Sequence, residues 1–180
     1  MTDTIQSLLQ NRISDAAVAV KYADLQLSWA QYLSESAACA AALLGVADPH
    51  RPMHIGALLG NTPDMLTQMA AAGLGGYVLC GLNTTRRGEA LAADIRRADC
   101  QIVVTDAEHR PLLDGLDLTD TQVFDTSTPL WAELVDGAGA LVPHRQVEMT
   151  ADSTCRQLIG ASGTSVVTAS SGHSKRVSSD

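Results

Sequence analysis

Between residues 54 and about 135, short apolar runs alternate with segments of helical character. A continuous apolar run of strand length is typical of a strand whose two faces are both covered, as in a parallel sheet. The connecting segments are long enough to hold a helix, which parallel strands require for their crossover connections. The alternation therefore predicts an α/β fold with a parallel sheet and flanking helices, joined by right-handed crossovers. The expected strands are residues 54–59, 77–80, 101–105 and 121–124.

Local signals place the remaining elements. Residues 17–20 and 25–27 predict a β-hairpin, and Ser28 is expected to cap a helix that runs to about residue 44. Pro63 suits the first position of the next helix, because its missing N–H would be unpaired there anyway. Gly73 to Gly76 are interpreted as the end of that helix and a tight turn. Short helices are expected from Thr85 or Gly88 to Ala98 or Asp99, and at residues 111–116 and 131–135.

After Thr150 the sequence changes character. The stretch is rich in serine and threonine, and its one strand candidate is Val166-Val167. We therefore divide the chain into an α/β part at residues 1–150 and a tail at residues 151–180. The tail has little apolar surface to offset the entropy of ordering, so we expect it to be less ordered than the sheet.

Composition excludes several functional classes. The formal net charge is −8, and no basic face of the kind that neutralises nucleic-acid phosphates is visible. The four cysteines have no zinc or redox spacing, and the five histidines show no metal-ligand spacing. No secretion signal or membrane-spanning run is found, because the apolar stretch at residues 65–82 is broken by Gln68 and by glycines. A cytoplasmic protein with reduced, mostly buried thiols and no metal site is expected.

Three motifs that would carry chemistry fail on inspection. Gly73 to Gly76 follow a helix and precede a strand, which is the wrong order for a dinucleotide-binding turn. Ser162 has Gly160 before it, but Thr164 stands where a nucleophile elbow needs its second glycine. No lysine follows Gly163 as a Walker loop requires. We therefore name no catalytic residue from the sequence.

One candidate binding segment remains, formed by Ser162, Gly163, Thr164 and Ser165. Backbone amides and hydroxyls of such a short polar loop can wrap the oxygen atoms of a phosphate group. Taken alone, the same four residues are also typical of a linker, and both interpretations remain open at this point.

Residues 54–106 resemble the early part of fatty-acyl-CoA ligases of the adenylate-forming, AMP-binding superfamily. Those enzymes carry a strand, an Asn-x-Pro turn, a helix of small residues, and a later strand ending in aspartate. The segment 28–33, SWAQYL, resembles the opening motif of the same family. The resemblance extends over roughly residues 15–165. The matching positions are Asn61, Pro63, Gly76, Leu82, Asn83, Arg87, Gly88, Leu91, Asp99 and Asp106.

The resemblance implies that Ser162 to Ser165 belong to a loop that binds the phosphates of ATP, with Mg as its companion ion. The family's loop is similar to F-T-S-G-T-[ST]-G-x-P-K, and only part of it is present here. Val166 replaces the glycine that follows the matched residues, and Ala169 replaces the lysine. The implied activity is ATP-dependent activation of a fatty acid to an acyl-adenylate and then to acyl-CoA, with fatty acid and CoA as substrates.

The missing lysine, and the absence of later family motifs, imply a fragment cut short at the phosphate loop and inactive by itself. One alternative is a non-catalytic α/β interaction module, whose exposed apolar surface is covered by a protein partner. Another is an unrelated nucleotide-binding α/β domain.

Overall fold

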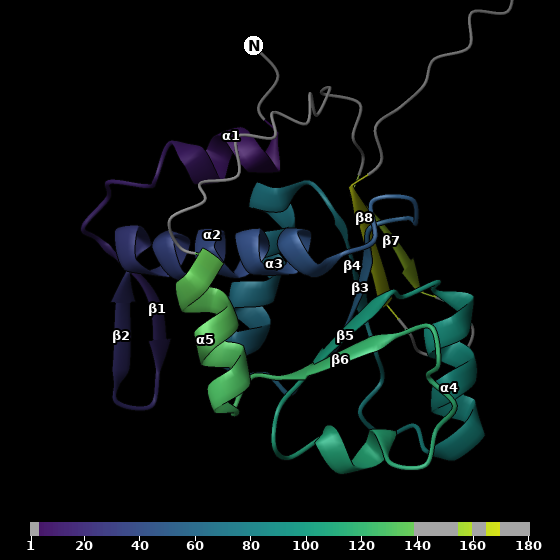
Figure 1. Cartoon of the computed structure of the whole chain (residues 1–180). Coiled ribbons are helices and arrows are strands. Elements are labelled where there is room, and N and C mark those ends of the chain that lie inside the picture. The colour runs from purple at the N-terminus through teal and green to yellow at the C-terminus, as the bar shows by residue number, and fades with distance from the viewer. Residues whose placement is uncertain (1–3, 139–154, 160–164, 170–180) are drawn as a thin grey trace, which may run out of the picture.

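The structure is a computed structural model that describes residues 4–138 and, as backbone only, residues 155–159 and 165–169. Four neighbouring strands of its main sheet are parallel (Figure 1): β3 (His54–Leu58), β4 (Val78–Gly81), β5 (Ile102–Thr105) and β6 (Gln122–Asp125). The strand order across the sheet is β6-β5-β3-β4-β8-β7. The α/β prediction is confirmed, and so is the expectation of three parallel strands and two helices between residues 54 and 106.

The tail contributes more to the sheet than the sequence predicts. β7 (Cys155–Ile159) and β8 (Ser165–Ala169) form an antiparallel pair, and β8 also pairs antiparallel with β4. The prediction of one strand at Val166-Val167 is therefore correct for β8 and wrong for β7, which it missed. Open backbone groups along the edge of β4 explain the pairing, because an edge strand offers unpaired N–H and C=O groups to any extended segment.

Local signals begin and end the crossover helices as expected. Pro63 is the first residue of α3 (Pro63–Gly75), and Gly76 ends that helix with φ 68°. Glycine adopts this left-handed conformation without the steric cost that a Cβ imposes. α4 (Gly88–Arg97) follows β4, and a short 3₁₀ helix, η1 (Arg110–Leu113), follows β5.

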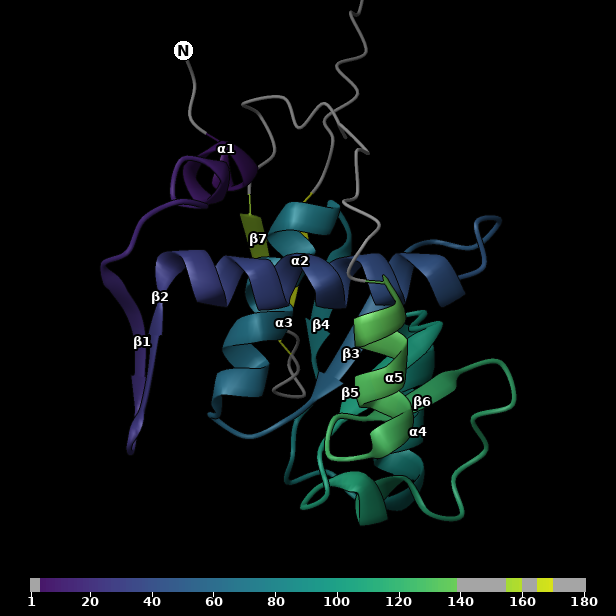
Figure 2. The ribbon, with the colours of Figure 1, turned by 60° about the vertical axis from the view of Figure 1, so that its left-hand side comes forward.

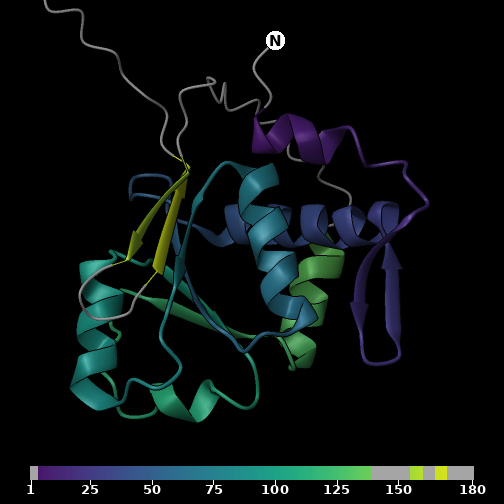
Figure 3. The ribbon, with the colours of Figure 1, turned by 180° about the vertical axis from the view of Figure 1, so that it is seen from behind.

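Helices cover the sheet on both faces (Figure 3). α3 shares one face with α2 (Trp29–Val46) and α5 (Pro129–Ala138), and α4 and η1 lie on the other. Alternate residues of each strand point to opposite faces, so Ile55 and Ala57 belong to the first core and Leu58 to the second. Ile55 and Leu58 are fully buried. The two cores together hold the parallel strands in a fixed register.

The N-terminal segment packs against the helices of the first face. β1 (Val18–Tyr22) and β2 (Leu25–Ser28) form the predicted hairpin, which extends beyond the helices (Figure 2). Ser28 caps α2 as predicted: its hydroxyl accepts from the Gln31 amide at 3.2 Å. α1 (Ile5–Gln10) was not predicted from the sequence, and it packs against α3 near Gly73.

Three cysteines of the described chain, Cys39, Cys80 and Cys100, are free and buried. Burial raises the pKa of the Cys39 thiol to about 12, while a hydrogen bond from Gln68 lowers it. The folded chain therefore holds the Cys39 proton more tightly than the unfolded chain, whose thiol has a pKa of 9.0. This difference stabilises the folded state fully at pH values below 9.0. The contribution is lost as the pH rises toward about 12.

We expect a Cys155→Ser chain to react with Ellman's reagent slowly at about pH 8, because all three remaining thiols are buried away from the reagent and burial also disfavours the reactive thiolate of Cys39. The rate for the native chain should be at least roughly a hundredfold below the rate in denaturant. Absorbance of the released thionitrobenzoate measures both rates. Rapid labelling of any of the three thiols in the native chain would contradict their burial.

Candidate functional site

The carboxyl ends of the parallel strands meet at one edge of the sheet, which we call the carboxyl edge. In open α/β sheets, ligands bind in the crevice outside this edge, where adjacent strands send their connections in opposite directions. β3 continues toward β4 on one side, while β5, its other neighbour, continues toward β6 on the opposite side. The crevice is therefore expected between the segments that follow β3 and β5.

The candidate phosphate loop connects β7 to β8. Ser162, Gly163 and Thr164 lie outside the described residues, so their arrangement stays a prediction. Ser165 is the first residue of β8, and its backbone lies beside Gly81 and Ile159. Gly81 is the last residue of β4. The residues that flank the candidate loop therefore stand at the carboxyl edge, next to the end of a parallel strand.

The segment after β4 is held by its own side chains. Asn83 accepts hydrogen bonds from the Thr85 amide and hydroxyl, both at 2.8 Å. Arg86 donates to the Asp94 carboxylate on α4 at 3.0 Å, and Arg97 donates to the same carboxylate at 2.9 Å. Asp94 is 2% exposed. A charge this deeply buried needs partners: Arg86 fastens the segment to α4, and Arg97 pairs with Asp94 within the helix.

The other arginine contacts of this region are also local. Arg87 donates to the Thr84 and Arg86 carbonyl oxygens, at 2.7 and 2.8 Å. Arg96 pairs with Glu89 on the exposed side of α4. Arg86, Arg87, Arg96 and Arg97 thus contact groups of their own loop and helix.

An aspartate and a histidine follow β5. Asp106 Oδ1 lies 2.7 Å from His109 Nδ1 and also accepts from the His109 amide at 2.9 Å. Burial alone raises the pKa of Asp106, but hydrogen bonds from the His109 side chain, the His109 amide and the Gly60 amide together hold it below its usual value. A Cβ on Gly60 would lie 3.5 Å from His109 Cε1, so this pair packs against the end of the segment after β3.

The N-terminus of α3 completes the crevice. Thr62 stands at the N-cap, but its side chain makes no capping hydrogen bond, and its buried hydroxyl has no partner. Thr126, which follows β6, donates to the Asp64 carboxylate in the first turn of α3 at 2.8 Å. The positive end of a helix dipole and an unused hydroxyl are therefore present beside the Asp106–His109 pair.

This arrangement supplies amides, hydroxyls and one Asp–His pair, which are groups that orient a polar ligand. The Asp106–His109 pair and the free Thr62 hydroxyl were not predicted from the sequence as site features. Their position directly after buried strands was the available signal, because parallel strands bring those positions to one edge. Within the described ranges, no group of three or more His, Cys, Asp or Glu side chains is placed to hold a metal ion. No helix in those ranges is both long and apolar enough to cross a membrane.

Curated relatives of the chain are acyl-CoA ligases. The chain is 40% identical over 150 residues to the medium/long-chain-fatty-acid–CoA ligase FadD17 of Mycobacterium marinum, which covers 81% of this chain and 28% of that protein. It is 36% identical over 166 residues to the steroid-22-oyl-CoA synthetase of Rhodococcus jostii, and this match covers 89% of this chain and 29% of that protein. The chain thus spans less than a third of the length of these relatives. No protein-family model matches it.

Solved structures share the fold of this chain. The N-terminal domain of FACL13 from Mycobacterium tuberculosis superposes with a TM-score of 0.70 at 17% identity, covering 80% of this chain and 38% of that one. ATP-bound MatB from Rhodopseudomonas palustris superposes with a TM-score of 0.66 at 19% identity, and the match covers 79% of this chain and 29% of that one. At these identities the likeness establishes the architecture alone.

Proposed function

We propose that this chain, which is homologous to the N-terminal part of fatty-acyl-CoA ligases, supplies the first α/β portion of such an enzyme. The observation that carries the proposal is 40% identity to a fatty-acid–CoA ligase across 81% of the chain. The proposed reaction has two steps. A fatty-acid carboxylate attacks the α-phosphate of ATP and releases pyrophosphate, and the CoA thiol then attacks the acyl carbonyl and releases AMP.

The proposed role of this portion is to hold the phosphates of ATP at the carboxyl edge. Ser162, Gly163, Thr164 and Ser165 are the proposed contacts, with backbone amides and hydroxyls donating to phosphate oxygens. Mg, which neutralises phosphate charge when bound, is part of the same proposal. The support is the position of Ser165 beside the end of β4 and the ATP-bound state of one structural neighbour.

The described residues around this edge have a positioning role in the proposal. The Arg86–Asp94–Arg97 cluster fastens the segment after β4, beside which Ser165 lies. Fixed groups of this kind lower the cost of orienting a ligand, because they need no rearrangement when it binds. We propose that the chain acts in the cytoplasm, where its buried thiols stay reduced.

Isothermal titration of the 180-residue chain with ATP·Mg tests the nucleotide proposal. We expect weak, saturable binding, because half of the family's loop pattern is present and its lysine is absent. The double substitution Thr164→Val and Ser165→Ala should weaken binding by roughly a hundredfold or more, since each hydrogen bond to a charged group is worth about 1.5–3 kcal/mol.

Thr119→Ala is the matched control for that titration. Its hydroxyl donates to Asp117 at 2.6 Å in the segment before β6, so it lies at the opposite edge of the sheet. It should leave binding unchanged. Absence of any heat with ATP·Mg and with a non-hydrolysable acyl-adenylate mimic, or an equal loss in both variants, would contradict the proposed site.

A non-catalytic interaction module is the second candidate function. It is favoured by large apolar side chains on α1 and α3 that stay exposed, namely Ile5, Leu8, Leu66 and Met69. Such side chains are covered when a partner docks. Ligase coding sequence directly downstream of this chain's gene would support the ligase proposal, and its absence would favour the module. The match to ligases argues against an unrelated nucleotide-binding domain.

A further inference from the structure

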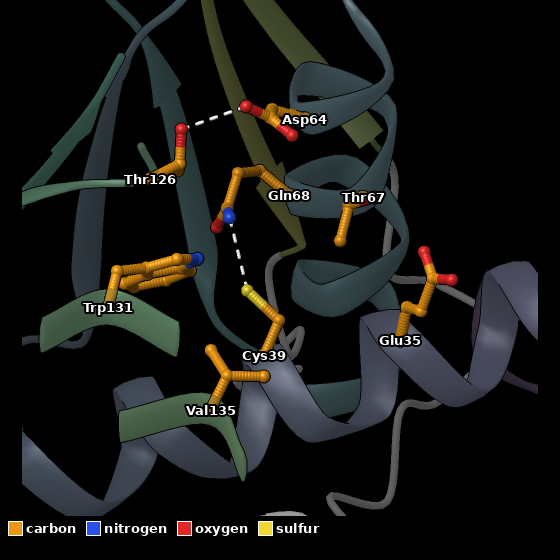
Figure 4. Close-up of a pocket in the computed structure, with 8 residues that line it drawn as sticks. All are labelled: Glu35, Cys39, Asp64, Thr67, Gln68, Thr126, Trp131 and Val135. Carbon is orange, nitrogen blue, oxygen red and sulfur yellow. Dashed lines mark hydrogen bonds between the residues drawn. The ribbon is translucent and has the colours of Figure 1, made fainter. Parts of the chain in front are cut away.

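A pocket of about 170 Å³ opens between α2, α3, α5 and the segment after β6 (Figure 4). An apolar cavity of about 150 Å³ can hold a molecule the size of benzene, so this pocket has room for a small organic ligand. Asp64 and Gln68 line it from α3, Cys39 from α2, and Trp131 and Val135 from α5.

The inner wall of the pocket carries a polar group that has no partner. Gln68 is 1% exposed, and its amide nitrogen donates to Cys39 Sγ at 3.1 Å. Its amide oxygen, Oε1, is buried and accepts no hydrogen bond. Figure 4 shows the amide lying between Trp131 and Cys39, within the lining of the pocket. A buried carbonyl oxygen left in this way costs free energy, and a hydrogen-bond donor placed beside it recovers that cost.

The outer wall is negatively charged. Glu35 and Asp64 line the pocket, and among the described residues no lysine, arginine or histidine lines it with them. Thr126 donates to one oxygen of Asp64 at 2.8 Å, which orients that carboxylate. The ligand that complements these walls therefore carries a positive charge and several N–H donors.

We propose that this pocket binds a small primary ammonium compound, with its ammonium group between the Gln68 amide oxygen and the Asp64 carboxylate. A divalent metal ion suits the pocket less well, because Ca²⁺ takes 6–8 oxygen ligands and two carboxylates supply only part of that shell. A primary ammonium group has three N–H donors, so it can satisfy a carbonyl oxygen and a carboxylate together. The short alkyl chain would lie against Trp131 and Val135.

The pocket and the proposed ATP-phosphate loop use different residues. The described residues that line the pocket belong to α2, α3, α5 and the segment after β6, whereas the loop is formed by Ser162 to Ser165. Asp64 and Thr126 also border the crevice, so the amine titration and the ATP·Mg titration are separate tests.

Fluorescence of Trp131 reports directly on the pocket. The chain has two tryptophans, so Trp29→Phe leaves Trp131 as the single emitter. Titration of this variant with n-propylammonium chloride should give a saturable change in emission. 1-Propanol, which has the same chain but no charge, and tetramethylammonium, which has charge but no N–H donor, should bind at least roughly tenfold more weakly. Potassium chloride at equal ionic strength controls for salt.

Two substitutions in the Trp29→Phe background test the proposed contacts. Gln68→Met keeps an unbranched side chain of similar size but removes the oxygen, and Asp64→Asn keeps the shape but removes the charge. Each should weaken n-propylammonium binding by at least roughly tenfold. Glu133→Gln is the matched control, because Glu133 is an exposed carboxylate on α5 that does not line the pocket. It should leave binding unchanged.

Circular dichroism establishes that each variant is folded before titration. If Gln68→Met fails to fold, Asp64→Asn at an exposed position carries the test. No saturable change, equal responses to the amine and the alcohol, or binding that survives Asp64→Asn would overturn the proposal. A crystal structure grown with n-propylammonium that shows only water molecules beside Gln68 would overturn it as well.

Discussion

Purified residues 1–180 are expected to form no acyl-CoA from ATP, fatty acid and CoA. The chain aligns with 28% of the length of a fatty-acid–CoA ligase, so most of that enzyme has no counterpart in it. The loop that resembles the family's ATP-phosphate loop has Ala169 where the family has lysine. Adenylation depends on in-line placement of the carboxylate and on cations that stabilise the developing phosphate charge, and these effects carry most of such catalysis.

Fatty-acid-dependent release of pyrophosphate measures this expectation, with FadD17 of Mycobacterium marinum as the active reference. Val166→Gly with Ala169→Lys restores two family residues and should improve ATP binding slightly, with turnover still absent. The gain is limited because Val166 lies in β8 opposite Cys80 and Leu158 on the neighbouring strands, where glycine weakens a strand. Pyrophosphate release above a no-enzyme control by the unmodified chain would show that it holds a complete site.

Gly56→Val is expected to destabilise the fold more than any other substitution considered for this chain. Gly56 lies in β3 at the centre of the sheet, and a Cβ there would come within 2.9 Å of Leu82 Cδ1. It would also lie 3.2 Å from Val103 Cγ2 and 3.3 Å from Cys100 Sγ. Valine adds two further carbons to this crowded part of the second core. Overpacking of this kind typically costs about 1–3 kcal/mol, and the crowding by three side chains places this position near the upper end, about 3 kcal/mol.

Thermal unfolding followed by circular dichroism measures the effect. For a domain of this size, about 3 kcal/mol corresponds to a fall in Tm of roughly 6–12 °C. Gly45→Ala is the matched control, because Gly45 lies in α2 and a Cβ there meets nothing within 4 Å. It should raise stability by up to about 1 kcal/mol, since alanine favours the helix. A Gly56→Val chain as stable as the native one would show that the second core has room that the structure does not contain.

The elements themselves follow from local sequence. Continuous apolar runs predict β3, β4 and β5, because only strands covered on both faces tolerate them. Ser28 and Pro63 mark the starts of α2 and α3, and Gly76 marks the end of α3, since each residue satisfies a requirement of a helix terminus. The segment of β7, CRQLI, carries neither a long apolar run nor a β-branched cluster, so it gave no comparable signal.

The candidate site followed from the sequence only in part. Resemblance to a family marked Ser162 to Ser165, yet the residues around the crevice come from four separate segments. Asp106 and His109 meet Gly60 across 46 residues or more of chain, and Thr126 meets Asp64 across 62. Their contacts depend on which strands are neighbours in the sheet. A run of apolar residues indicates that a strand is buried, but it does not indicate which strands lie beside it.

By itself, then, the sequence determined most of the strands and helices, apart from α1 and β7, and the termini of α2 and α3, because those choices depend on backbone sterics, capping and local periodicity. The tertiary structure alone decided the strand order, the antiparallel addition of β7 and β8, the need for glycine at position 56, and the pocket around Gln68. The physical reason is that the interactions behind these features are long-range in sequence. Each of these features is made by side chains and backbone edges that are distant along the chain and meet only when the sheet has formed.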